Sequence, residues 1–375
     1  MIIEVIEKLY EDHMGVMIMK FIMGFIMGFI QKYLYKTSGI LSVASLLSLI
    51  IIGQVDAGFT LWSSKGLEKE PLFSKNSMHI EPVLFNSREN VFSEKQLIRK
   101  GILMTQPGAK ATVVISHGFM CNKYDVGFLR QIFTDCNVLT YDFRAHGEQT
   151  DGQLCTFGHN EAYDVIAAAQ FLKKHPLTKD TSLIGYGFSM GAVATIEAQS
   201  KNPLFTALIL DCPFDSSDQV VKKSLDNLKI SVFGYQMDIP GKSILEKYAF
   251  HPYVQSTIKT LLKTVTQIDT QKINMHMMPT YPVKSIKAIN VPCFFIHCKN
   301  DEKITIEAVK RVFHGAQGPK KLWLTNGRNH YDSFFYNPEK YTQRVRKFVD
   351  KVLDGTFKHK NKIIEDAPED LERRV

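Results

Sequence analysis

The chain has 375 residues, of which 45% are hydrophobic and 22% are charged, so it is long enough for one large domain or two small ones and too apolar for a disordered protein. Its 46 Lys and Arg residues against 38 Asp and Glu residues give a formal net charge of +8. A basic surface suits an anionic membrane or nucleic acid, but the chain contains no Lys/Arg run with interleaved aromatic residues and no nucleic-acid-binding motif, so nucleic acid is not an expected partner.

The first 57 residues are expected to form a leader outside the folded domain. Residues 14–30 are almost wholly apolar, and residues 40–53 form a second apolar run, which is shorter than the membrane span of about 20 residues but typical of the core of a signal peptide. Small residues before the junction predict cleavage after Ala57 and export of the remainder. An uncleaved membrane anchor or hairpin, and a later start of translation, are the alternatives. A mature chain beginning at Gly58 would identify the exported form.

The next part of the chain predicts a parallel sheet. Residues 58–110 are expected to supply one or two antiparallel edge strands. Six apolar runs then end in Gly, Asp, Asn, Pro or His, and helical patterns lie between several of them, at residues 160–175, 191–201 and 302–315. Buried strands separated by helices indicate a mostly parallel α/β sheet with helices on both faces, where ligands bind at the carboxyl ends of the strands. The runs are ATVVISHG (111–118), NVLTYDFR (137–144), TSLIGYGFS (181–189), TALILDCP (206–213), VPCFFIHCKND (291–301) and KKLWLTNGRNH (320–330).

Two segments depart from this alternation. Residues 214–288 separate two predicted strands by far more than one crossover needs, and their helix-like pieces predict an inserted helical lid. Apolar side chains on this segment either line a pocket for an acyl chain or lipid or pack the lid onto the core. Residues 356–375 are charged and low in apolar content, which predicts a frayed tail. The folded domain is therefore expected over residues 58–355.

Six cysteines lie after residue 120, and none forms a C-x-x-C pair or shows metal-ligand spacing. A zinc site is therefore not expected. Export would permit disulfides, whose pairing the sequence leaves open, although buried free thiols are the commoner case in apolar strands. The cysteines are Cys121, Cys136, Cys155, Cys212, Cys293 and Cys298.

The motif G-x-S-x-G occurs between a predicted strand and a predicted helix, as Gly187-Phe188-Ser189-Met190-Gly191. This is the context of a nucleophile elbow. Side chains at the two glycine positions would collide within so tight a turn. Ser189 would project from the end of the sheet, and the helix N-terminus would present the Met190 N–H to a developing oxyanion. The alternative is a glycine-rich turn in which Ser189 caps the helix.

A serine nucleophile needs a base and an orienting acid, which follow such an elbow in the order Ser, Asp or Glu, His. Asp301 and His330 end two later predicted strands in that order. Asp211, which ends the strand before the insertion, is the rival acid. An earlier strand ends in His117-Gly118-Phe119, where the Phe119 N–H is the expected second oxyanion donor. His117 is expected to orient this loop.

These segments, together with DFRAHG (142–147) and the stretch NHYDSFFYNPEKY (329–341), resemble the α/β-hydrolase superfamily. From residue 78 to 354 the chain resembles a branch of bacterial serine esterases and lipases. The resemblance implies an α/β-hydrolase fold with Ser189 as nucleophile, Asp301 as acid and His330 as base. It implies that Phe119 and Met190 donate to the oxyanion, and that DFRAHG is a structural loop containing His146. The chain departs from the relatives at Cys298-Lys299-Asn300, where they have Gly or Asp.

The sequence therefore predicts a serine hydrolase, exported or membrane-anchored, that cleaves a carboxylic ester of a small molecule or lipid through an acyl-serine intermediate. It needs no cofactor, because acyl transfer by a triad requires none. Thioester hydrolysis and peptidase activity use the same triad and stay open. A noncatalytic binding protein or a membrane-associated effector on this fold belongs to a different class. The binding protein would lack a triad member, and none is missing.

Overall fold

A computed structural model describes residues 78–148, 150, 152–227, 229–232, 235–238, 242–256, 275–358 and 361–367. The predicted leader, residues 1–57, lies outside the described residues. In the described part of the chain, no helix combines the length and the apolar character needed to cross a membrane. The described residues fall into two compact units, a larger one within residues 78–223 and 275–367 and a smaller one within residues 224–256.

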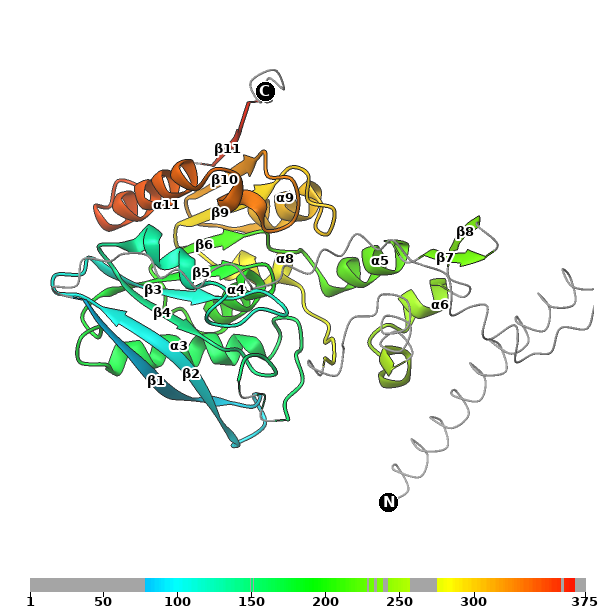
Figure 1. The fold of residues 1–375 in the computed structure, drawn as a ribbon, viewed down its shortest axis with the longest axis horizontal. Coiled ribbons are helices and arrows are strands. Elements are labelled where there is room, and N and C mark those ends of the chain that lie inside the picture. Colours follow the sequence, from blue (N-terminus) through cyan, green and yellow to red (C-terminus); the bar gives the residue numbers. More distant parts are fainter. Residues whose placement is uncertain are drawn as a thin grey trace, which may run out of the picture. The chain divides into compact units, whose positions relative to one another are not determined.

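The larger unit is built on a nine-stranded sheet with the order β1-β2-β4-β3-β5-β6-β9-β10-β11 (Figure 1). β1 pairs antiparallel with β2, and β2 with β4, whereas every other neighbouring pair is parallel. The six apolar runs thus form six of the parallel strands, and the antiparallel edge expected before residue 111 is confirmed. The strands are β1 (His79–Arg88), β2 (Gln96–Thr105), β3 (Ala111–Ser116), β4 (Asn137–Tyr141), β5 (Ser182–Phe188), β6 (Ala207–Asp211), β9 (Cys293–Cys298), β10 (Lys320–Thr325) and β11 (Lys362–Glu365).

Helices cover both faces of this sheet. The helices α3 (Glu161–Lys174), α4 (Met190–Lys201) and α9 (Ile306–Gly315) share one cluster of buried apolar residues, and η1 (Gly127–Phe133) and α11 (Pro338–Leu353) share another. Within β3, Val114 belongs to the first cluster, and its neighbours Val113 and Ile115 belong to the second. Successive side chains of a strand point to opposite faces of the sheet. Each continuous apolar run therefore contributes side chains to two hydrophobic cores, one on either face.

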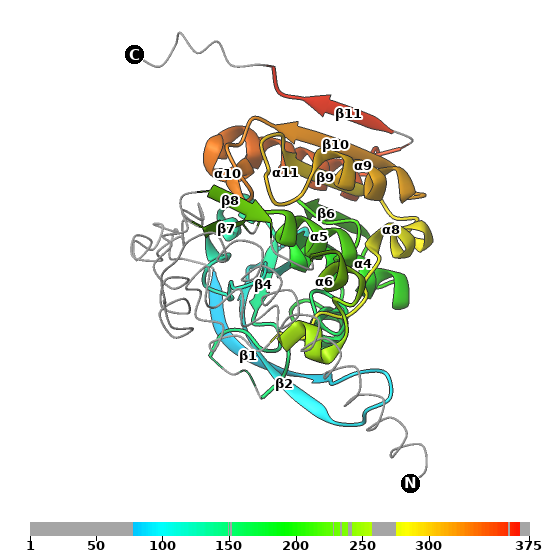
Figure 2. The ribbon, with the colours of Figure 1, turned by 90° about the vertical axis from the view of Figure 1, so that its right-hand side faces the viewer.

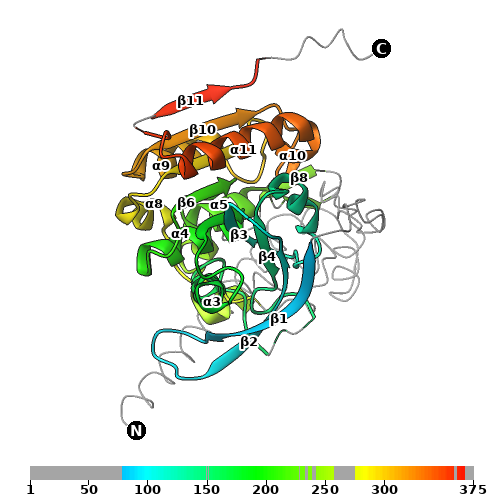
Figure 3. The ribbon, with the colours of Figure 1, turned by 90° about the vertical axis from the view of Figure 1, so that its left-hand side faces the viewer.

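The C-terminal segment differs from the predicted frayed tail. Its residues 362–365 form β11, which extends the sheet beside β10 at the edge opposite β1 (Figures 2 and 3). Asp366 is buried, accepts a hydrogen bond from Trp323 Nε1 at 3.0 Å, and lies 2.6 Å from Lys340 Nζ. The prediction was wrong for residues 362–367 because backbone pairing with β10 and the buried carboxylate of Asp366 hold a segment whose other side chains are mostly exposed.

The insertion between β6 and β9 is also not wholly helical. Its described elements are α5 (Ser217–Asn227), β7 (Lys229–Val232), β8 (Tyr235–Asp238), α6 (Lys242–Lys247), α8 (Pro282–Ser285) and η2 (Ile286–Ala288). β7 and β8 pair antiparallel as a separate two-stranded sheet. Only two residues, one of them Gly, separate the two strands in the sequence, and this spacing is typical of a β-hairpin. The prediction of a purely helical insertion overlooked this signal.

The DFRAHG loop after β4 is anchored by a buried ion pair. Arg144 Nη2 lies 2.8 Å from Asp164 Oδ1, and both side chains are at most 1% exposed. Ser87 Oγ on β1 donates to the same carboxylate at 2.6 Å. Burial raises the pKa of Asp164, but Arg144 outweighs this effect and holds the pKa below its ordinary value. The pair therefore ties this loop, which lies at the carboxyl end of β4, to α3 and β1.

Asp164→Asn is expected to lower the free energy of unfolding by about 3 kcal/mol, because it leaves the buried Arg144 charge without its partner. Urea unfolding of the full chain measures the change. Asp180→Asn is the matched control, since Asp180 is exposed and its substitution should change stability by less than about 0.5 kcal/mol. Equal stabilities of the two variants would contradict the anchoring role of the pair.

Candidate active site

The turn between β5 and α4 holds Ser189 in a strained backbone conformation, with φ 52° and ψ −116°. The flanking glycines make this turn possible. A Cβ on Gly187 would lie 2.4 Å from Ala192 Cα, and a Cβ on Gly191 would lie 2.1 Å from the Ser116 carbonyl oxygen. Ser189 lies at the N-cap position directly before α4, and its side chain makes no capping hydrogen bond. Its hydroxyl is therefore not used as a helix cap, which was the alternative explanation for the motif.

The structure brings Ser189, His330 and Asp301 together. His330 Nε2 lies 3.0 Å from Ser189 Oγ, and His330 Nδ1 lies 2.5 Å from Asp301 Oδ2. The three residues are each at most 8% exposed, although 141 residues separate Ser189 from His330 in the sequence. Each follows the carboxyl end of a different parallel strand, β5, β9 or β10, which is the edge where the sheet was expected to bind ligands.

The carboxylate of Asp301 is held in place by its own loop. Its Oδ1 accepts hydrogen bonds from the backbone N–H groups of Lys303, at 2.8 Å, and Ile304, at 2.9 Å. Burial raises the pKa of Asp301, but the hydrogen bond and charge of His330 outweigh burial, so the pKa is lowered overall. The carboxylate therefore stays ionised near neutral pH, and its Oδ2 is fixed on Nδ1 of the imidazole. The unusual Cys298-Lys299-Asn300 stretch leaves this geometry intact.

The rival acid, Asp211, faces other partners. Its Oδ2 accepts a hydrogen bond from Tyr341 Oη at 2.7 Å, and Tyr341 Oη lies 2.5 Å from Tyr186 Oη. Burial raises the pKa of Asp211 to about 7. The backbone of this residue supports the elbow, since its carbonyl accepts the Ser189 N–H at 2.8 Å. The carboxylate that contacts His330 in the structure is thus that of Asp301, not that of Asp211.

The two expected oxyanion donors lie on the segments that the sequence indicated. Met190 is the first residue of α4, where N–H groups have no acceptor within the helix. Phe119 follows β3 in a loop that His117 orients: Phe143 N–H donates to His117 Nε2 at 3.1 Å, and His117 Nδ1 lies 2.7 Å from the Gly118 carbonyl oxygen. Because Nε2 accepts, Nδ1 is the protonated nitrogen. Burial lowers the pKa of His117 to about 3, so the ring stays neutral.

His146 has a similar structural contact. Its Nδ1 lies 2.8 Å from the Arg144 carbonyl oxygen, so Nδ1 donates there. Burial lowers the pKa of His146, which keeps the ring neutral. The ring packs edge-to-face against Phe119, with centroids 5.8 Å apart. His146 therefore joins the DFRAHG loop to the expected oxyanion loop.

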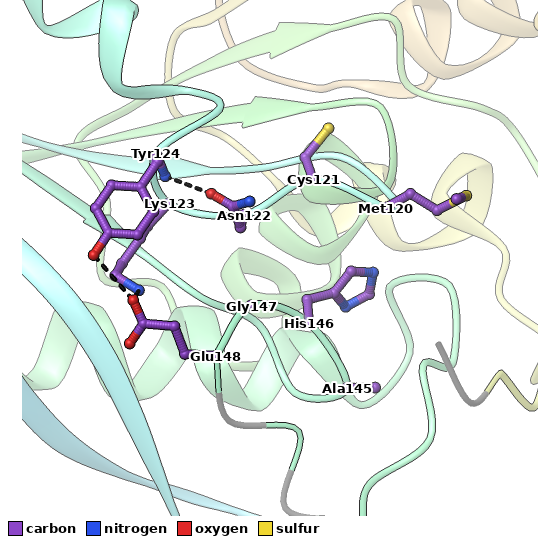
Figure 4. A pocket seen from close by; sticks show the side chains of 9 residues that line it. All are labelled: Met120, Cys121, Asn122, Lys123, Tyr124, Ala145, His146, Gly147 and Glu148. Carbon is purple, nitrogen blue, oxygen red and sulfur yellow. Dashed lines mark hydrogen bonds and ion pairs between the residues drawn. The ribbon is translucent and has the colours of Figure 1, made fainter. Parts of the chain in front are cut away.

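A pocket of about 280 Å³ lies next to the expected oxyanion loop, between residues 120–124 and 145–148 (Figure 4). The Lys123 ammonium lies 2.6 Å from Asp142 Oδ2 and 3.3 Å from Glu148 Oε1, and Figure 4 shows Tyr124 pointing toward the same glutamate. The lysine, tyrosine and glutamate side chains of the pocket are thus paired within the protein, whereas Nε2 of His146 has no hydrogen-bonding partner among the described residues. The pocket adjoins the expected oxyanion loop, because its first residue directly follows Phe119.

Sequence reasoning missed Tyr331, which directly follows the expected base His330 and packs against its ring. It has φ 80°, in the left-handed region that a tyrosine rarely adopts. Its ring centroid lies 4.0 Å from that of His330, and burial raises the pKa of its hydroxyl well above the ordinary value. A Cβ on Gly118 would lie 3.2 Å from the same hydroxyl. The available signal was the position of this tyrosine directly after the expected base.

The six cysteines are free thiols, and all but Cys121 are buried. Their burial agrees with the expectation that apolar strands contain unpaired thiols. Cys212 lies directly after β6 with φ 44°, and its neighbours include Asp211, Asp301 and Cys298. Sequence reasoning did not place this thiol at the site.

Comparisons with known proteins agree with this fold. The family model described as serine aminopeptidase, S33, matches residues 107–331. An uncharacterized protein of Bacillus subtilis, YqkD, is 27% identical over 262 residues, which are 68% of this chain and 77% of that protein.

Two solved structures of esterases have a similar fold. The esterase Pf2001 of Pyrococcus furiosus gives a TM-score of 0.54 at 21% identity and covers 74% of this chain and 93% of its own. An acetyl xylan esterase from Paenibacillus gives a TM-score of 0.52 at 14% identity and covers 74% and 85%. At such identities the likeness concerns the fold alone.

Proposed function

Because the chain belongs to the serine aminopeptidase S33 family of α/β hydrolases, we propose that it is a serine hydrolase that cleaves carboxylic esters through an acyl-Ser189 intermediate. One observation carries the proposal: His330 lies 3.0 Å from the Ser189 hydroxyl through Nε2 and 2.5 Å from Asp301 through Nδ1. A base oriented by a carboxylate and bonded to a serine is the arrangement that activates the hydroxyl as a nucleophile.

In the proposed reaction, His330 Nε2 accepts the proton of Ser189 Oγ as the oxygen attacks the ester carbonyl. The negative charge that develops on the carbonyl oxygen is stabilised by the N–H groups of Met190 and Phe119. The protonated ring then gives its proton to the leaving alcohol. Water, deprotonated by the same ring, releases the acid from the serine in the second half of the cycle. The carboxylate of Asp301 stabilises the imidazolium in both halves.

The substrate of the proposed reaction is an ester of a small molecule or a lipid. Hydrolysis of p-nitrophenyl acetate, butyrate, octanoate and palmitate by the full chain tests the reaction and measures the preferred acyl length. A preference for long chains would indicate a lipid substrate, whereas a preference for acetate would indicate a small ester. Absence of turnover for every ester, with the chain folded, would refute the esterase proposal.

Amide hydrolysis is the second candidate, since the matching family model is described as a serine aminopeptidase. The same triad cleaves amides and thioesters. Aminoacyl p-nitroanilides, assayed beside the esters, separate the two reactions. An aminopeptidase would hydrolyse the anilides only when the α-amino group is free, whereas an esterase would leave both the free and the blocked anilides intact.

We also propose that the hydrolase acts outside the cytoplasm, exported or anchored at a membrane surface. The support is the apolar leader with small residues before Gly58. N-terminal sequencing of the chain recovered from its native cells tests this proposal. A mature chain that begins at Gly58 is the expected result for export, and a chain that retains the leader in the membrane fraction is the result for an anchor.

A further inference from the structure

Three side chains of different chemistry meet beside the expected nucleophile. The sulfur of Cys212, a carboxylate oxygen of Asp301 and a ring nitrogen of His330 all lie within 4.8 Å of one another. Their residues are 2%, 7% and 7% exposed. Thiolate, carboxylate and imidazole are the ligands that Zn²⁺ binds in proteins, and catalytic zinc sites use three of them and leave the fourth position to water.

The sheet explains why no sequence spacing revealed this group. Cys212 follows β6, Asp301 follows β9, and His330 follows β10. These three strands are consecutive neighbours in the sheet and run parallel, so their carboxyl ends meet at one edge. The ligand atoms therefore converge from positions 89 and 29 residues apart in the sequence, a pattern that rules based on C-x-x-C pairs do not detect.

A second buried imidazole lies against the same carboxylate. His297 on β9 is 0% exposed, and its Nδ1 lies 3.8 Å from Asp301 Oδ2. Among the described residues, neither of its ring nitrogens has a hydrogen-bonding partner of good geometry. Burial lowers the pKa of His297 to about 4, so the ring is neutral, which is the form that binds metals. The site thus contains a spare nitrogen donor beside the three converging ligands.

The charges around the group are mixed. Burial raises the pKa of the Cys212 thiol well above its ordinary value, and the nearby carboxylates of Asp211 and Asp301 raise it further. The negative charge of Asp301, whose pKa is lowered, attracts a cation. The positively charged ammonium of Lys303, which interacts with Asp301 and Cys212, repels a cation. A dication therefore has to displace the thiol proton, and the resulting thiolate adds the charge that favours binding.

We propose that Cys212, Asp301 and His330 form an inhibitory zinc site. The thiol of Cys212 releases its proton to solvent and forms a bond from sulfur to Zn²⁺, with no change of oxidation state. His330 binds the ion through Nδ1, so its hydrogen bond to Asp301 breaks and its ring proton moves from Nδ1 to Nε2. An N–H then faces Ser189 Oγ, so the ring cannot accept the serine proton. Zinc binding stands apart from the proposed esterase function, whereas inhibition rests on it.

Zinc binding is tested on the full chain by competition with a chromophoric chelator of Zn²⁺. Cys212→Ala is expected to weaken zinc affinity at least about tenfold. Cys136→Ala is the matched control, because Cys136 is an equally buried free thiol outside the group, and it should bind zinc as the unaltered chain does. Equal zinc affinities of the Cys212→Ala variant and the unaltered chain would overturn the site. If that variant does not fold, His330→Ala serves instead, with the same expected weakening.

Inhibition is tested by titrating Zn²⁺ into the ester assay and reversing it with a chelator. Each variant is compared with its own activity in the absence of zinc. Cys212→Ala should need at least about ten times more zinc for half-inhibition. If zinc binds through Cys212 but the chain hydrolyses no ester, the esterase proposal fails and the metal site stands. If esters are hydrolysed and zinc inhibits both forms equally, the inhibitory site fails alone.

Discussion

Ser189→Ala is expected to lower kcat for ester hydrolysis by about 10⁴-fold or more, with the fold unchanged. The substitution removes the only atom that forms the acyl bond, while His330, Asp301 and the expected oxyanion donors remain. The strained backbone at this position (φ 52°) accommodates alanine no worse than serine, so stability should change little. Steady-state kinetics with the preferred p-nitrophenyl ester measures the loss.

Ser200→Ala is the matched control for this experiment. Ser200 lies on the same helix, α4, and its hydroxyl donates to the Glu197 carbonyl oxygen at 2.9 Å, so it takes no part in the proposed chemistry. Its variant should retain turnover within about twofold, because a small substitution away from the proposed site is nearly neutral. Ester turnover that survives in Ser189→Ala would mean that another group is the nucleophile.

The fold could be predicted to the extent that its signals are local. Each apolar run such as ATVVIS carries its own strand signal, and the glycines around Ser189 encode a turn that tolerates no side chain at either position. β11 was not predicted, because its position beside β10 depends on backbone hydrogen bonds between the two strands and on the contacts of Asp366. Neither of these leaves an apolar pattern in the sequence. The hairpin of β7 and β8 was overlooked although its two-residue spacing was present in the sequence.

Part of the candidate site could also be predicted from the sequence, and part could not. The sequence predicted the order of Ser189, Asp301 and His330 and their positions at strand ends. The order follows from the nucleophile elbow, after which the acid and then the base occur along the chain. The positions follow from the rule that parallel sheets bind ligands at the carboxyl ends of their strands. The contacts that Tyr331 and Cys212 make within the site could not be predicted from the sequence, because they depend on φ angles of 80° and 44° and on which strands are neighbours. Sequence periodicity contains neither quantity.

The choice between Asp301 and Asp211 shows what geometry adds. Both carboxylates end strands after the nucleophile, and sequence alone could only favour one of them. In the structure, Oδ2 of Asp301 lies 2.5 Å from Nδ1 of His330. Oδ2 of Asp211 instead accepts a hydrogen bond from Tyr341 Oη at 2.7 Å. If the first contact orients the base, the two aspartates must differ greatly in their effect on turnover.

Asp301→Asn is accordingly expected to lower kcat by about 10⁴-fold, because an amide facing Nδ1 favours the wrong tautomer of the ring and cannot stabilise the imidazolium. Asp211→Asn should change kcat by less than about tenfold, since the amide oxygen can still accept the Tyr341 hydrogen bond and no contact with His330 is lost. The two variants are compared in the same ester assay. A larger loss in Asp211→Asn than in Asp301→Asn would transfer the role of the acid to Asp211.

Stability against pH checks the role of Asp211 independently of catalysis. Burial raises its pKa in the folded chain to about 7 from an ordinary 3.8, so the folded state holds a proton that the unfolded state loses. The stabilisation from this proton is fully present below pH 3.8 and is lost as the pH rises through about 7. Asp211→Asn removes the titration, so the stability of the variant should fall less than that of the unaltered chain across this range. An identical fall in both would mean that Asp211 is already ionised in the folded state, and its hydrogen bond from Tyr341 would then be made to a carboxylate.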